Sequence, residues 1–250
     1  MSNEKAKKVL WWVCLFLAPL VLLTIELFHP AGFTSDPGMY QYLSMPQPHS
    51  SEHKALAYFG PQWWFVLHMI QTPMVGLVSI GLWLMLDEVD RRGGILGTLS
   101  AWISRVATFV FLIYYTALDS IGGIGLGRVI EITETLAKAS PGEPHLTPDQ
   151  LAGVVLVLNT MWTDQWVGGV GSLVSLTGSW AVFVAALFAA IALFVSKKVS
   201  WPPLIVLIAF GWQLQLSHAS LHGPIAFALL IVAALWIWRQ RRRSQAQQRD

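Results

Sequence analysis

The sequence predicts an all-α, polytopic integral membrane protein, built as a bundle of about six transmembrane helices. Of the 250 residues, 54% are hydrophobic and only 12% are charged, which is about half the charged fraction of soluble domains. Apolar segments that are long enough to cross a hydrocarbon core of about 30 Å recur along the chain. Basic residues gather at alternate ends of these segments, as the positive-inside rule requires. We therefore expect a single transmembrane domain over residues 1–250.

The first span is predicted at residues 9–28, which are almost entirely apolar and follow Lys5, Lys7 and Lys8. At about 1.5 Å per residue, this segment is long enough to cross the membrane as a helix. Lysines before an apolar run are also typical of a signal peptide. Because no small-residue cleavage site follows, we expect a retained helix. Residues 29–61 contain several prolines and are expected to form a polar outer loop.

The second and third spans are predicted at residues 62–86 and 95–118, joined by a short charged turn. Trp63 and Trp64 open the second span, where tryptophans typically anchor a helix at the membrane interface. The glycine-rich run that begins at Gly122 could be mistaken for a phosphate-binding loop. No strand precedes it, so the glycines favour close helix packing or a flexible exit from the membrane.

Residues 119–166 are expected to be an outer loop that contains two helical elements. Arg128 to Lys138 has the pattern of a short amphipathic helix. Thr147, Pro148 and Gln150 form a helix start, with a capping threonine, a proline in the first turn and a glutamine three residues on. The apolar residues 151–161 are too few to span the membrane, so we place them at the outer surface or in a re-entrant element.

The last three spans are predicted at residues 167–196, 202–217 and 224–238, followed by a basic cytoplasmic tail at residues 239–250. Glycine and serine are frequent in the first half of residues 167–196, a composition that suits close helix contacts in lipid. The last two spans are short, which favours helices that are tilted or flanked by aromatic anchors.

The basic clusters indicate how the chain is oriented. In a six-span topology they all fall on the same side of the membrane, at residues 5–8, 91–92, 197–198 and 239–243. Because cytoplasmic loops carry an excess of lysine and arginine, both termini are expected in the cytoplasm and the protein in the cell (inner) membrane. The loops at residues 29–61, 119–166 and 218–223 then face outward.

Polar residues that are distant in sequence converge on the outer level of this topology. Such residues are costly in a hydrocarbon layer and are usually functional. The set comprises Glu26, His29, His68, Gln71, Asp119, His218 and His222.

Three local patterns within this set suit a metal or cofactor. His218 and His222 are four residues apart, so on a continuous helix they would share one face, as two metal ligands or as a ligand and its partner. Glu26 and His29 have the spacing used in dinuclear carboxylate sites, which also arises often by chance. His68, Gln71 and Thr72 form a polar stripe on one helical face. Either His68 is a ligand, or the stripe makes an interhelical hydrogen bond.

Arg105 is the one basic residue expected deep in the membrane, where an unpaired guanidinium is expensive. It either pins helices together or binds an anionic group such as a substrate or a haem propionate. The candidate structural partners are Gln213, Gln215, Glu26 and the carbonyl groups near Pro19.

The first hypothesis for function is that the outer histidines bind haem b or a transition-metal ion in a redox or electron-transfer role. In the haem model, His68 and either His218 or His222 are axial ligands and Arg105 meets a propionate. In the metal model, the candidate ligands are Glu26, His29, His68, Asp119, His218 and His222. Histidines on membrane helices resemble those of helix-bundle b-type cytochromes. The two-haem forms of that class carry paired histidines at both membrane depths, which this sequence lacks.

Two other functions remain open at this point. A small-solute or proton-coupled transporter could use the same polar residues as a path, although no internal repeat is evident. An accessory or assembly subunit without a cofactor could use them to hold helices together. The expected partners are membrane lipid and either other membrane subunits or further copies of this chain. Nucleic acid is not expected, because an arginine-rich tail beside a span sets topology and meets anionic lipid. The single cysteine, Cys14, excludes a disulfide framework within the chain.

Overall fold

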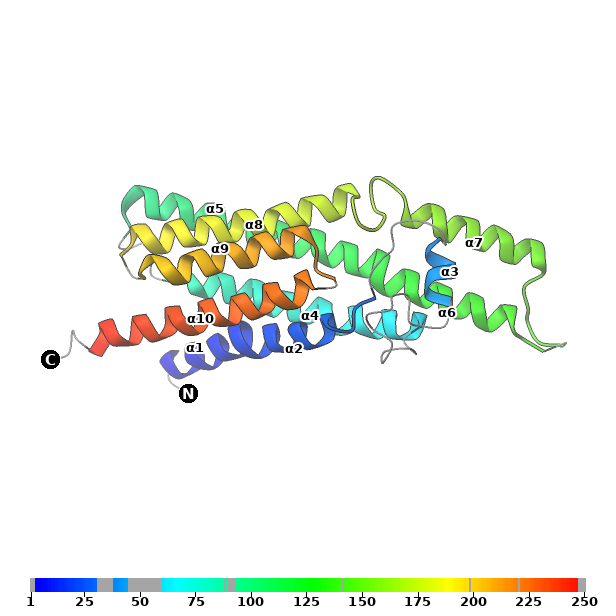
Figure 1. Cartoon of the computed structure of the whole chain (residues 1–250), viewed down its shortest axis with the longest axis horizontal. Helices are drawn as coiled ribbons and strands as arrows, with labels where there is room; N and C mark the ends of the chain where they lie inside the picture. The colour runs from blue at the N-terminus through cyan, green and yellow to red at the C-terminus, as the bar shows by residue number, and fades with distance from the viewer. Residues whose placement is uncertain are drawn as a thin grey trace. The chain divides into compact units, whose positions relative to one another are not determined.

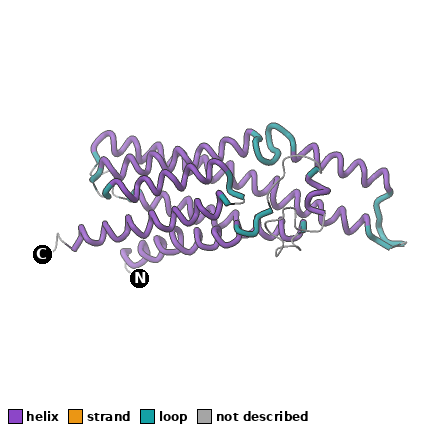
Figure 2. Tube along the Cα trace, viewed as in Figure 1, coloured by secondary structure: helices purple, strands orange, loops and turns teal. Residues whose placement is uncertain are grey.

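The computed structural model describes residues 3–30, 38–44, 60–87, 89, 93–140, 142–197, 199–219 and 221–246. This described part of the chain is 82% helical and contains no strand (Figure 2). The prediction of an all-α fold is therefore confirmed. The chain divides into two compact units, the first comprising Met1–Leu27, Pro73–Ile113 and Thr177–Asp250, and the second comprising Phe28–Thr72 and Tyr114–Leu176. Helices α4 (Pro61–Met85) and α5 (Gly94–Leu118) contribute residues to both units.

The first unit begins with an unbroken helical segment made of α1 (Asn3–Trp12), η1 (Val13–Leu17) and α2 (Ala18–Glu26). The middle part, η1, is π-helical, and the N–H of Ala18 donates to the carbonyl of Val13. Pro19 follows directly and has no N–H to donate, so the regular α-helical ladder is interrupted here. The segment matches the first predicted span.

Three further helices complete the first unit: α8 (Leu173–Val195), α9 (Trp201–Leu216) and α10 (His222–Ala246). Helix α10 packs against α9 and α2 (Figure 1). The predicted start of the fourth span at residue 167 is wrong, because α8 begins only at Leu173. The Asp164 carboxylate accepts the N–H groups of Trp166 and Val167 at 2.8 and 2.9 Å, which holds a turn before the helix.

The described part of the predicted basic tail at residues 239–250 is helical, because α10 continues to Ala246. Arginine and glutamine are strong helix formers, and no glycine or proline interrupts them. Arg241 on this extension donates to the Met85 carbonyl at 2.6 Å and lies over the ring of Trp11. The extra helical turns therefore tie the end of α10 to the end of α4 and to α1.

Other contacts in the first unit gather at the same end. Lys7 forms an ion pair with Asp87 at 2.8 Å, and the backbone N–H of Ser200 donates to Gln240 at 2.8 Å. Trp12 packs edge to face against Trp238. The beginning of α1, the end of α4, the turn before α9 and the end of α10 thus meet at one end of this unit (Figure 1). The basic residues Lys7 and Arg241 are thus both held at this end of the first unit.

Within the residues that the structure describes, five stretches of helix are long and apolar enough to cross a membrane, and α9 is a shorter apolar helix. The long stretches are Lys5–Glu26, Pro61–Met85, Gly94–Ala137, Leu173–Val195 and His222–Arg243.

Within the predicted outer segment at residues 119–166, the two expected helical elements are present, and the residues before the first of them are helical as well. Helix α5 continues through the π-helical η3 (Asp119–Gly125) into α6 (Leu126–Ala137). The glycines do not end the helix, because they allow side chains of α4 to approach its backbone. A β-carbon at Gly127, for example, would lie 2.8 Å from the ring of Trp64. Of the two sequence alternatives for this run, close packing is confirmed.

The second unit also contains α3 (Met39–Ser44) and α7 (Pro148–Trp162). Helices α3, α6 and α7 contact one another (Figure 1). The predicted start of α7 is confirmed, because Thr147 and Gln150 form a capping box with Pro148 in the first turn. The apolar core of the unit consists of Met39, Tyr42, Leu43, Trp64, Leu126, Ile130 and Leu158.

We predict that Gly211→Ala destabilises the first unit. A β-carbon at Gly211 on α9 would lie 2.6 Å from Cβ of Ala186 on α8, and overpacking of this kind costs about 1–3 kcal/mol. The matched control is Gly76→Ala on α4, where a β-carbon would meet nothing within 4 Å and alanine is the better helix former. Thermal unfolding in detergent should show a lower midpoint for the first variant only. Equal midpoints for both variants would contradict close packing of α8 on α9.

Candidate functional site

The imidazole of His68 lies on α4 inside the second unit and is only 3% exposed. Its Nδ1 is 2.7 Å from the backbone carbonyl oxygen of Trp64, one helical turn earlier. A carbonyl oxygen only accepts hydrogen bonds, so we assign the ring proton to Nδ1. The neutral ring then carries its lone pair on Nε2. This is the arrangement found in most metal-binding histidines, where a hydrogen bond on one nitrogen orients the other as ligand.

The imidazole of His29 follows the end of α2 and is 6% exposed. Its Nδ1 is 2.7 Å from the Pro30 carbonyl oxygen, which by the same argument leaves the lone pair on Nε2. The rings of His29 and His68 meet edge to face, with centroids 5.4 Å apart. Two buried histidines from different segments are thus in direct contact and are held in the same tautomer.

Two consecutive tryptophans on α4 position these histidines. The indole N–H of Trp63 donates to the Phe28 carbonyl at 2.9 Å, which fixes the residue before His29. Trp64 is 1% exposed and packs against both imidazoles, with centroid distances of 5.1 Å to His29 and 4.5 Å to His68. The prediction that Trp64 is an interfacial anchor is therefore wrong. The position of Trp64 in the sequence could not reveal this, because a tryptophan near the end of an apolar helix can either anchor the helix at the interface or pack inside the protein.

The glycines of η3 form the wall on the other side of His68. The indole N–H of Trp64 donates to the Gly122 carbonyl at 2.9 Å. A β-carbon at Gly123 would lie 2.2 Å from Cγ of His68, so only glycine leaves room for the ring. Short π-helical segments are frequent at functional sites because they re-aim the residues that they contain. Here η3 presents a side-chain-free surface to the imidazole.

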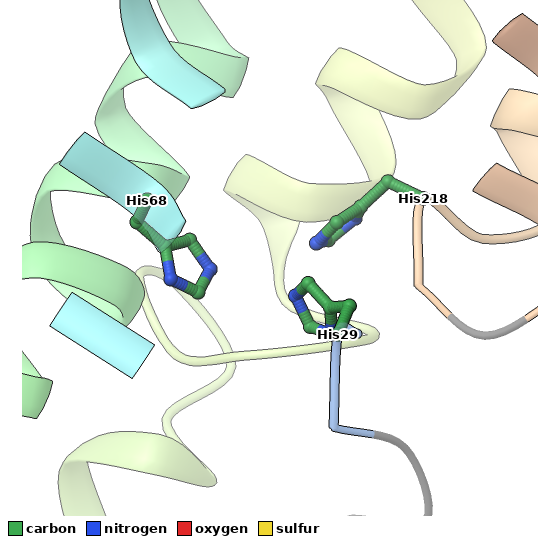
Figure 3. A group of neighbouring side chains, drawn as sticks. All are labelled: His29, His68 and His218. Atoms are coloured by element: carbon green, nitrogen blue, oxygen red, sulfur yellow. The ribbon is translucent and has the colours of Figure 1, made fainter. Parts of the chain in front are cut away.

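Figure 3 shows the imidazoles of His29 and His68 next to each other. Their ligating nitrogens lie within 4.8 Å of each other. In a tetrahedral zinc site, with Zn–N bonds of about 2.0–2.1 Å, the nitrogens are about 3.4 Å apart, so a bound ion would draw the rings closer. His218, another predicted ligand, lies in the first unit between α9 and α10, and burial lowers the pKa of its imidazole to about 4.

The expectation that His218 and His222 share a helical face is wrong. Helix α9 ends at Leu216, and the backbone at Ser217 is extended before α10 begins at His222. Pro224 favours a helix start here because its ring fits the first turn. The imidazole of His222 is exposed, and its Nδ1 is 2.8 Å from Oε1 of Gln213. His222 therefore has a partner on α9 within the first unit.

The predicted carboxylate ligands are not grouped with the two contacting imidazoles. Helix α2 ends at Glu26, so the spacing of Glu26 and His29 does not place them on adjacent turns of one helix. Asp119 is buried at the first position of η3, and its Oδ2 accepts a hydrogen bond from Thr72 at 3.3 Å. Of the residues in the metal model, the structure thus brings His29 and His68 into contact within the second unit.

The polar stripe on α4 makes interhelical hydrogen bonds, as one of the two interpretations predicts. Thr72 bonds to Asp119, and Nε2 of Gln71 donates to the Tyr115 hydroxyl at 2.5 Å. Together with the contact between His68 and Gly123, these bonds form a polar ladder from α4 to α5 and η3. Tyr115 is a member of this ladder that the sequence pattern did not indicate.

The guanidinium of Arg105 is buried in the first unit. It donates to the Leu86 carbonyl at 3.3 Å and lies over the ring of Trp102, 5.2 Å from its centroid. Helical side chains lean toward the N-terminus of their own helix, and a long arginine extends this reach to the end of α4. The sequence indicated neither of these partners. Both support the structural interpretation of Arg105, a pinned helix contact.

No family model, curated protein or solved structure matches this chain, so its function is argued from the site alone.

We predict that Gly123→Ala displaces the imidazole of His68. The new methyl group would overlap the ring at Cγ and Cδ2, at a cost of about 1–3 kcal/mol. The control is Gly122→Ala, whose β-carbon would be in ordinary contact with Trp162 at 3.5 Å. Near-ultraviolet circular dichroism and thermal unfolding should change for the first variant and not for the second. A native spectrum and midpoint in Gly123→Ala would contradict the tight contact between η3 and His68.

Proposed function

We propose that this chain is a membrane protein that binds one divalent transition-metal ion through His29 and His68. The observation that carries the proposal is the pair of Nδ1 contacts to backbone carbonyls, each 2.7 Å long. They orient Nε2 of both buried imidazoles as lone-pair donors before any ion arrives. A rigid, preorganised donor pair of this kind is what a metal site needs and what simple helix adhesion does not require.

The donor set indicates the class of ion. Imidazole nitrogens suit zinc, copper, iron and nickel, whereas magnesium and calcium prefer oxygen ligands. Two protein ligands also leave coordination positions open for water or a substrate, whereas structural zinc sites use four protein ligands. Zinc would supply Lewis-acid chemistry at that position, and copper or iron would supply electron transfer. The chain's own residues hold the ligands, exclude water through Trp64 and fix the ring tautomers.

A single ion fits the site better than haem b. In a haem with two axial histidines the imidazoles approach the iron from opposite faces of a flat porphyrin. The rings of His29 and His68 touch each other, and Trp64 packs against both of them. A porphyrin bound to His68 would have to separate these rings. The contacts of Arg105 with Leu86 and Trp102 likewise support a structural role more than a bond to a propionate.

We further propose a six-span topology in the inner membrane, with both termini in the cytoplasm. Counting the shorter α9 with the five long apolar stretches gives an even number of crossings. The ends of α1 and α10 lie together in the first unit, and both carry basic residues. An even count and the positive-inside rule support this orientation.

The first test is metal binding by the purified full-length protein, with zinc measured by elemental analysis and cobalt as a spectroscopic probe. We expect about one ion per chain in the wild type. His68→Ala and His29→Ala should each weaken binding at least about 100-fold, because removing a ligand costs more than the 10–100-fold loss typical of its supporting residues. The control is His145→Ala, an exposed imidazole whose Nδ1 is also near a backbone carbonyl. Wild-type affinity in His68→Ala would contradict the proposal.

The second test separates the ion from haem. Visible absorption spectra of the same preparation, oxidised and reduced with dithionite, should show no haem band, because the packed rings leave no slot for a porphyrin between His29 and His68. A stoichiometric reduced haem b spectrum that is lost in His68→Ala would favour the haem model and reject the single-ion site.

A further inference from the structure

A divalent ion at the histidine site would bring two positive charges into a buried place with neutral ligands. Burying charge without compensation is expensive, whatever the ligand geometry. The site therefore requires a nearby negative group, or binding would be weak. This inference rests on the proposed metal-binding function and asks which group supplies the charge.

Asp119 has the position that this role requires. It is 1% exposed, and among the described residues its Oδ1 has no hydrogen-bond partner. Its Oδ2 touches the hydroxyl of Thr72 at 3.3 Å, and the same hydroxyl donates to the His68 carbonyl at 2.9 Å. A carboxylate with an unsatisfied buried oxygen is costly by itself. A cation nearby would offset that cost.

Contacts on two helical segments, α4 and η3, each indicate that Asp119 lies about one helical turn from His68. On α4, Thr72 lies one turn after His68 and bonds to both it and Asp119. On η3, Gly123 lies against the His68 ring, and Asp119 precedes Gly123 by one turn. A helical turn rises about 5.4 Å. At such a separation inside a protein, opposite charges interact by several kcal/mol in the most favourable case.

We propose that Asp119 is a positioning residue that supplies the compensating negative charge for a cation bound at the histidines. It acts through space and not as a ligand, because its oxygens lie outside the group of ligating atoms. The rival is Glu26, another buried carboxylate, whose Cβ lies near Gly223. The contacts favour Asp119, because it bonds to the helix that carries His68. The site consequently selects a free divalent cation over a metal carried in an anionic complex.

The test compares zinc and cobalt affinity in the full-length protein and in four variants. Asp119→Asn keeps the shape and removes the charge, and it should weaken binding about 10–100-fold. Asp119→Glu restores the charge and should recover most of the affinity. Thr72→Val removes the hydrogen bond but keeps the carboxylate, so it should change affinity less than about 3-fold. Glu26→Gln should likewise have a small effect.

Thermal stability gives a readout that a purely structural role would not produce. Without metal, Asp119→Asn should unfold near the wild-type temperature, because the amide keeps the shape of the carboxyl group and can still contact Thr72. With saturating zinc, the wild type should gain stability and the variant should gain less. A lower midpoint of Asp119→Asn without metal would show a structural role and overturn the inference.

The remaining outcomes also separate the two proposals. If the wild type binds metal and Asp119→Asn binds equally well, the inference is overturned and the proposed function stands. If Glu26→Gln loses affinity in place of Asp119→Asn, the charge belongs to Glu26 and the inference is again overturned. If the wild type itself binds neither zinc nor cobalt, the proposed function fails.

Discussion

The hydrogen bond from the Trp64 indole to the Gly122 carbonyl connects the parts of the second unit on which the site depends. At 2.9 Å and fully buried, it ties α4 to the π-helical segment η3. The same residue accepts the proton of His68 Nδ1 on its backbone carbonyl and packs its ring against His29. On its other side the ring belongs to the apolar core formed by α3, α6 and α7. One side chain therefore joins the packing of the unit to the orientation of its imidazoles.

Composition and hydropathy were sufficient to predict the all-α class and most of the long helices. Apolar length and basic flanks are local properties, so they survive without knowledge of tertiary contacts. The misplaced boundaries all lie where tertiary contacts or polar helix formers decide the structure. Glycines next to Asp119 suggested an exit from the helix, yet the helix continues because Trp64 and His68 fill the space beside them. Likewise, the arginines after Trp238 were expected in a tail, but Arg241 donates to the Met85 carbonyl and lies over the ring of Trp11.

The histidines themselves were identifiable, because imidazoles at one level of an apolar bundle are unusual. Their partners were not. The spacing of His218 and His222 suggested a shared helical face, whereas a break at Ser217 separates them. Similarly, helix α2 ends at Glu26 itself, before His29. Spacing predicts proximity only along an unbroken element, and each of these pairs spans the end of one. The roles of Trp64 and Gly123 depend on contacts between α4 and η3, which no pattern within either segment encodes.

The π-helical segment also constrains how this chain can change in length. A π-helical turn is an α-helical turn with one additional residue, so deleting one residue between Asp119 and Gly125 would allow a regular α-helix to form. Because the extra residue would be removed from the π-helical turn itself, the later residues of α6 would keep nearly the same facing, and Leu126 and Ile130 would remain in the apolar core around Trp64. The glycines of η3 would instead shift relative to His68, whose ring would lose the side-chain-free surface that fits it. Within this stretch, a single-residue deletion would therefore alter the site while leaving the packing of α6 in place.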